Sequence, residues 1–228
     1  LIGIIIMAFA YFDLGETNRN ISRSISEQIN EYPELFGSKR FWAYCFTTVF
    51  ASGSFFAYIG GAPFVSTNSF NLSSTEFGIY FGLTTLGYVS GSFISGKYSE
   101  KLGIQFMLLS GSWITVVGLL AGLVIFVIGT KHPVVFFGSM IWAGIGNGMV
   151  LPNANAGLLS VRPSLAGSAS GIGGAIMLGF GAFFAYIAGL ISTIESGVYP
   201  LISLMVFISI LGVVVVKYIS FLEKRTLN

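Results

Sequence analysis

Six long apolar stretches dominate this sequence and limit what it can fold into. A helix needs about 20 residues to cross the hydrocarbon layer of a bilayer, and each stretch meets that length with essentially no charge at its middle. The stretches cover residues 41–66, 75–95, 104–129, 134–160, 167–191 and 199–220. Because lipid offers the backbone no hydrogen-bond partner, such runs must be helical. The sequence therefore predicts an all-α, polytopic membrane protein.

The composition excludes the main alternatives. Hydrophobic residues make up 54% of the chain and charged residues 9%, whereas soluble domains carry about 25% charge. A transmembrane β-barrel would alternate in polarity over segments of about ten residues, but "VVGLLAGLVIFVIG" is an unbroken apolar run. An enzyme is not expected, because the spans hold no HExxH-type pair and no pair of acids. With a single cysteine, Cys45, and a single histidine, His132, no metal or cofactor is expected.

Two segments precede the six stretches. Residues 1–12 are apolar but would rise only about 18 Å as a helix, and nothing basic precedes them, as a signal peptide requires. We interpret them as the cytoplasmic end of a truncated transmembrane helix. Residues 13–40 would form a cytoplasmic central loop. In it Ile21, Ile25 and Ile29 predict an amphipathic surface helix that Pro33 ends, with a solvated linker as the alternative.

The distribution of basic residues predicts the orientation. If the spans alternate, ten of the 11 Lys and Arg residues fall on one side and only Lys131 on the other. The ten are Arg19, Arg23, Lys39, Arg40, Lys97, Lys101, Arg162, Lys217, Lys224 and Arg225. Basic residues favour the cytoplasmic side. The loop before the first full span and the tail at residues 221–228 are therefore expected to be cytoplasmic.

The bundle at residues 41–220 divides into two triplets, 41–129 and 134–220, which we expect to be inverted copies. The first and fourth spans are each interrupted late by glycines and then a proline, Pro63 or Pro152. Broken helices at matching positions of inverted repeats indicate a transporter's binding region. Small residues at every fourth position predict close helix packing. These rows are Gly53–Ala57–Gly61, Gly78–Gly82, Gly87–Gly91 and Gly181–Ala185–Gly189.

A short motif between the second and third spans resembles a known loop signature. In "GKYSEKLG", the residues Gly96, Glu100, Lys101 and Gly103 fit G-x-x-x-[DE]-[KR]-x-G. This pattern resembles the cytoplasmic loop motif of the major facilitator superfamily, although Tyr98 stands where leucine is often found. The glycines would permit a tight turn, and the acid could lie near a helix N-terminus.

A longer stretch resembles one family within that superfamily. In "LPNANAGLLSVRPSLAGSASG", Pro152, Asn153 and Ala154 are followed by the run at 166–170. This spacing resembles that of the corresponding region in the Bcr/CflA (bicyclomycin and chloramphenicol resistance) family of drug:proton antiporters. The segments "FAYIGGAPFV" and "LGETN" also resemble segments of that family. The resemblance implies the six-helix C-terminal half of a twelve-helix transporter in the bacterial inner membrane. That transporter would export small amphipathic drugs in exchange for protons by alternating access. A non-transporting remnant, or a split half that needs a separate N-terminal bundle, is the alternative.

Few polar residues lie inside the spans. No Asp, Glu, Lys, Arg or His lies in a span centre, so the resemblance assigns proton coupling to the missing N-terminal half. The predicted cavity residues are Tyr58, Asn147, Asn155 and Met177. The asparagines of the fourth span point in different directions, and Asn153 and Asn155 could instead satisfy backbone freed by Pro152. Drugs, protons and the lipid bilayer are the expected partners, and nucleic acid is not.

Overall fold

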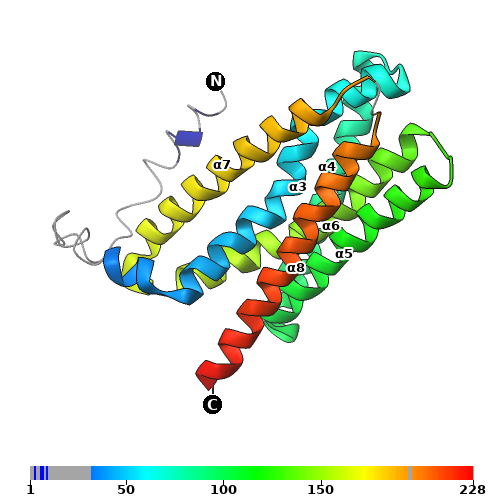
Figure 1. The fold of residues 1–228 in the computed structure, drawn as a ribbon. Helices are drawn as coiled ribbons and strands as arrows, with labels where there is room; N and C mark the ends of the chain where they lie inside the picture. Colours follow the sequence, from blue (N-terminus) through cyan, green and yellow to red (C-terminus); the bar gives the residue numbers. More distant parts are fainter. Residues whose placement is uncertain (1–2, 4–5, 8, 10–31, 195–196, 228) are drawn as a thin grey trace. The chain divides into compact units, whose positions relative to one another are not determined.

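The computed structural model describes residues 3, 6, 7, 9, 32–194 and 197–227 (Figure 1). Contacts divide the chain into two units, Leu1–Glu34 and Leu35–Asn228. The described residues of the first unit are helical. The predicted amphipathic helix around Ile21, Ile25 and Ile29 lies outside the described residues. Residues 32–37 are helical, so Pro33 lies within a helical segment and does not end one.

Six helices of the second unit are long and apolar enough to cross a membrane. All six predicted spans are helices, which confirms the all-α fold. They are α3 (Lys39–Phe70), α4 (Ser74–Leu102), α5 (Ile104–Val127), α6 (Pro133–Ser160), α7 (Ala166–Ile191) and α8 (Tyr199–Leu227), with a short 3₁₀ helix η1 (Pro163–Leu165) before α7. Several helices are longer than the apolar runs, because polar residues at their ends also favour helix.

The connection between α4 and α5 is tighter than predicted. Helix α4 continues through Gly96 to Leu102, and only Gly103 separates it from α5. Gly103 has a φ of 83°, which glycine adopts without steric cost. The predicted loop at 96–103 is therefore mostly helical, and Gly103 is the residue of this segment with a positive φ. Glu100 and Lys101 are both exposed, and neither forms an ion pair with another described residue.

The two intramembrane prolines do not interrupt their helices. Pro63 lies inside α3 and Pro152 inside α6, and both helices are continuous across them. The predicted interruptions are therefore wrong. A proline removes one hydrogen bond, but opening the helix further in an apolar environment would leave more backbone groups without partners.

Helices α3 and α6 form the centre of the bundle. Helix α6 contacts α3, α4 and α5, while α3 contacts α6, α7 and α8, and α5 contacts α8 (Figure 1). These main contacts are unchanged when α3, α4 and α5 are exchanged with α6, α7 and α8, but a smaller contact between α6 and α7 has no counterpart of similar extent between α3 and α4. The inverted repeat stays a prediction, to which this symmetry adds support.

The helices differ strongly in how much of their surface is covered. In the most apolar stretch of α3 and of α6, 56% of the residues are buried, against 17% in α4 and in α7. Large apolar side chains such as Phe93 and Leu190 are exposed on these two outer helices. Exposed apolar side chains are expected on helices that face lipid or another helical bundle.

Close backbone contact between α4 and α6 depends on four glycines, Gly87, Gly91, Gly144 and Gly148, which we call the glycine seam. A Cβ atom on Gly91 would collide with the carbonyl of Ile145, and each of the other three glycines also touches backbone of the opposite helix. Close packing is thus confirmed for the Gly87–Gly91 pair. It is wrong for Gly78 and Gly82, whose Cβ positions are open within the described structure.

A network of polar side chains, which we call the polar clamp, joins α3, α5 and α8 at one end of the bundle. The Arg40 guanidinium donates to Glu223 Oε1 through Nε at 2.9 Å and lies 2.8 Å from it through Nη2. The Tyr44 hydroxyl donates to the same oxygen at 3.0 Å. Gln105 Nε2 donates to the Tyr44 hydroxyl at 3.2 Å, and the Ser220 hydroxyl donates to Gln105 Oε1 at 3.0 Å. The start of α3 and the end of α8 therefore lie at the same end of the bundle, as six crossings require.

Candidate functional site

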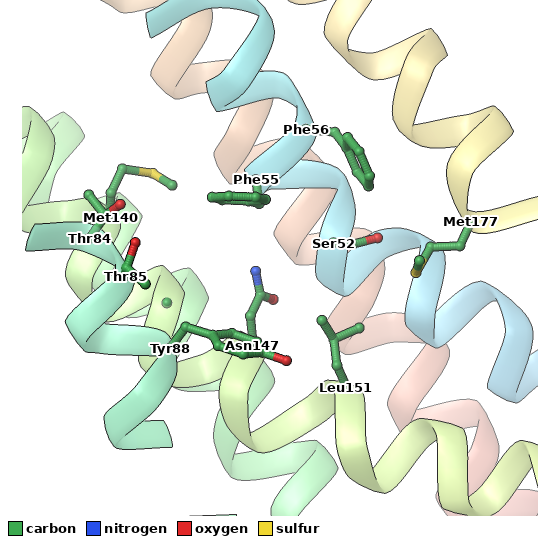
Figure 2. Close-up of a pocket in the computed structure, with 11 residues that line it drawn as sticks. Ser52, Phe55, Phe56, Thr84, Thr85, Tyr88, Met140, Asn147, Leu151 and Met177 are labelled. Atoms are coloured by element: carbon green, nitrogen blue, oxygen red, sulfur yellow. The ribbon is translucent and has the colours of Figure 1, made fainter. Parts of the chain in front are cut away.

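A cavity of about 330 Å³ lies among α3, α4, α6 and α7. Figure 2 shows the side chains that surround it. Its lining consists of Ser52, Phe55 and Phe56 from α3, Thr84, Thr85 and Tyr88 from α4, Met140, Gly144, Asn147 and Leu151 from α6, and Met177 from α7. Its volume falls in the range of about 300–1,000 Å³ that is typical of small-molecule sites.

Helical periodicity explains which residues face the cavity. On α6 the lining residues recur at intervals of three or four, as in Gly144, Asn147 and Leu151, which places them on one side of the helix. The glycine seam fixes the position of this wall against α4, because Gly144 touches the backbone of Thr84 and Tyr88. The cavity therefore opens beside the place where the two helix backbones are closest.

The cavity wall is mainly aromatic and aliphatic, with a few uncharged polar groups. No acidic, basic or histidine side chain lines it among the residues that the structure describes. The Ser52 hydroxyl donates to the Thr48 carbonyl at 2.7 Å, and the Thr84 hydroxyl donates to the Phe81 carbonyl at 2.6 Å. Each of these hydroxyls already donates its hydrogen bond within its own helix. Toward the cavity it can therefore only accept a hydrogen bond.

Two asparagines on α6 have opposite surroundings. Asn153 Nδ2 donates to Ser95 Oγ on α4 at 2.7 Å and to the Met149 carbonyl at 2.8 Å. Pro152 frees the carbonyl four residues before it, that of Gly148, so Asn153 does not satisfy the freed group as predicted. Asn147 is only 5% exposed, yet its amide forms no hydrogen bond with another described residue. Its side chain extends into the cavity near Phe55 and Tyr88 (Figure 2).

The structure brings together two of the four predicted cavity residues. Asn147 on α6 and Met177 on α7 both line the cavity (Figure 2). Tyr58 does not line it, because it lies roughly 120° around α3 from Ser52. It is fully buried, with its ring 5.3 Å from that of Phe81. Asn155 is exposed about two turns beyond Asn147 on α6 and is not part of the cavity lining.

Sequence reasoning missed most of the wall, including Phe55, Thr84, Thr85 and Tyr88. These residues carry no distinctive motif. The Gly87–Gly91 pair offered a usable signal, because the glycine face of α4 marks the side that packs on α6, and Thr84 and Tyr88 flank that face.

Comparison with known proteins assigns the chain to a family. Residues 1–186 match the profile of the Major Facilitator Superfamily. Because this match covers more than half of the chain, the protein belongs to that superfamily. It is therefore a transporter-family membrane protein that crosses the bilayer several times, and not an enzyme.

Two curated relatives refine this assignment. The chain is 26% identical over 196 residues to a protein of Haemophilus influenzae named bicyclomycin resistance protein homolog, a match that covers 80% of this chain and 46% of the relative. It is 33% identical over 101 residues to the uncharacterized MFS-type transporter YdgK of Bacillus subtilis, covering 43% of this chain and 25% of that protein. The chain thus spans less than half the length of the curated relatives it matches. The first relative supports the resemblance to the Bcr/CflA family.

Proposed function

We propose that this chain forms one half of a secondary transporter that exports small amphipathic compounds in exchange for protons. The observation that carries the proposal is the uncharged cavity among α3, α4, α6 and α7, in a chain of the Major Facilitator Superfamily. A largely apolar cavity with a few polar groups suits amphipathic molecules. One relative's name, bicyclomycin resistance protein homolog, supports drugs as the substrates.

The other wall of the transport path would come from a second six-helix half. Helices α4 and α7 border the cavity and are the least covered helices of the bundle. They are thus the natural contact surface for a second bundle, which would exclude lipid from the cavity. The ionisable group that binds the proton imported in exchange for the exported compound would lie in that second half, since no acid or base lines the cavity in the described part of this chain.

We assign the end of the bundle that carries the polar clamp to the cytoplasm, in a bacterial inner membrane. Arg40, Lys97, Lys101 and Lys224 belong to helix ends that the predicted topology places on this side, and Lys131 lies in the connection between α5 and α6 on the other. An excess of basic residues marks the cytoplasmic side. The C-terminus would then be cytoplasmic.

A complementation experiment tests the proposal. The 228-residue chain would be produced in an efflux-deficient bacterium alone, and together with a polypeptide encoded by the DNA immediately upstream of Leu1. We expect bicyclomycin resistance only when both are present, and we expect a protonophore to abolish it. Proton-driven resistance from the chain alone would contradict the need for a second half.

The same experiment separates transport from the alternative. If both polypeptides reach the membrane and neither bicyclomycin nor chloramphenicol resistance rises, the chain is a non-transporting remnant and the proposal is wrong. A Gly91→Leu variant, which blocks the glycine seam, is the control for resistance that does not depend on a folded bundle.

A further inference from the structure

The Asn147 side chain is mostly buried, and its amide has no hydrogen-bond partner among the described residues. The residue is 5% exposed. Buried amides in folded proteins almost always have partners, and Asn153, six residues later on the same helix, has two. The exception at Asn147 coincides with the cavity, into which its side chain extends (Figure 2).

The protein core does not supply the missing partner. Behind the cavity, Asn147 also borders a small buried space of about 10 Å³, next to Ser112, Thr115 and Ser209. Each of these hydroxyls donates to a carbonyl of its own helix, at 2.8, 3.2 and 2.7 Å respectively. The space can hold no more than about one water molecule. A larger partner for the amide must come from the cavity side.

The surroundings of Asn147 define which chemical group would fit. The Ser52 and Thr84 hydroxyls already donate within their own helices. The other polar side chains of the described wall are the hydroxyls of Thr85 and Tyr88 and the amide of Asn147. The amide alone among them offers two N–H donors together with a carbonyl acceptor. Phe55 and Tyr88 line the same cavity (Figure 2). A cation or anion entering this wall would lose its hydration without gaining an opposite charge.

We propose that Asn147 is a specificity-determining residue, which makes the cavity select uncharged aromatic compounds carrying a carboxamide over otherwise identical cations and anions. A carboxamide offers a donor and an acceptor side by side and can pair with the Asn147 amide through two hydrogen bonds. The aromatic body would pack against Phe55 and Tyr88. This inference rests on the proposed function, because it names the substrate class of the same cavity.

Three probes with the same aromatic body test the selection. Binding of 2-naphthamide, 2-naphthoate and trimethyl(2-naphthyl)ammonium to the full chain in lipid nanodiscs would be measured by isothermal titration, with empty nanodiscs as the blank. We expect the amide to bind about tenfold more tightly than either ion, since one net hydrogen bond corresponds to about that factor. Equal or tighter binding of either ion would overturn the proposal.

Variants at Asn147 locate the effect. Asn147→Leu should weaken 2-naphthamide binding about tenfold and leave both ions unchanged, whereas Asn147→Asp should shift the preference to the cation. The isosteric Asp variant keeps the test decisive if the Leu variant does not fold. Asn155→Leu, at an exposed asparagine of the same helix outside the cavity, is the matched control and should change nothing. An unchanged preference for the amide in both Asn147 variants would contradict the proposal.

The outcomes also separate this inference from the proposed function. Selective binding that depends on Asn147, without bicyclomycin resistance in cells, would support the selectivity and contradict export. Resistance in cells with binding that ignores Asn147 would support export and contradict the selectivity.

Discussion

Helix α6 contacts its surroundings in two opposite ways, through the glycine seam on one side and through the cavity wall on another. At the seam, Gly144 and Gly148 let the backbone touch α4 directly, and no side chain intervenes. At the cavity, Asn147 and Leu151 stand beside open space. The difference indicates that the seam sets the fold and the cavity is free to serve ligands. Substitutions should therefore change stability at the seam and binding at the cavity.

The largest effect is expected from filling the seam. Gly91→Val would place side-chain atoms against the backbone carbonyl of Ile145, which cannot move without shifting α6. We expect a loss of about 3 kcal/mol in the free energy of unfolding, at the upper end for overpacked cores. Gly82→Val on the same helix is the matched control, because its Cβ position is open. Unfolding by a denaturing detergent measures both, and equal stability would contradict the role of the seam.

A smaller effect should separate the two asparagines. Asn153→Leu removes the hydrogen bond to Ser95 and should cost about 2 kcal/mol in unfolding free energy, because a buried group loses its partner. Asn147→Leu removes no hydrogen bond to a described residue and should change stability by less than about 0.5 kcal/mol. Thermal unfolding followed by circular dichroism would compare them. An Asn147 variant as unstable as the Asn153 variant would show that both amides hold the fold.

The polar clamp should behave like the seam, with a smaller effect because it is partly solvated. The side chains of Arg40 and Glu223 are 34% and 21% exposed. Glu223→Ala removes the acceptor shared by Arg40 and Tyr44, and we expect a loss of about 1 kcal/mol in unfolding free energy. The control is Lys224→Ala, at an exposed neighbour that forms no ion pair with a described residue. If both variants unfold alike, the clamp does not stabilise the bundle.

The smallest effect is expected at Tyr58. Its hydroxyl is buried and forms no hydrogen bond of ordinary geometry with a described residue. Tyr58→Phe therefore removes a polar group that costs free energy to bury, and the variant should be as stable as the parent or more stable by up to about 1 kcal/mol. Binding of 2-naphthamide should not change, because Tyr58 does not line the cavity. A clear loss of stability or of binding would show that the hydroxyl has a partner in the membrane.

The sequence predicts the helices well and the cavity poorly, for a physical reason. Lipid requires each apolar run to be a helix whatever its neighbours are, so the six spans follow from composition alone. Which face of a helix meets which neighbour depends on packing between distant segments. Asn147, chosen from the sequence for its depth in the span, lies in the cavity wall, whereas Tyr58 lies on a face of α3 that does not line the cavity. The ion pair between Arg40 and Glu223, 183 residues apart, left no local signal.

The most direct test of the cavity is its access to water. In a Cys45→Ala background, which removes the native thiol, single cysteines would be introduced by Leu151→Cys in the cavity wall, Val150→Cys in the core and Phe93→Cys on the exposed apolar face of α4. A water-soluble methanethiosulfonate reagent would then be applied in nanodiscs to the chain assembled with the polypeptide encoded upstream, since the second half would keep lipid out of the cavity. We expect rapid labelling at position 151 and slow labelling at 150 and 93. Labelling at position 151 as slow as at 150 would contradict this expectation.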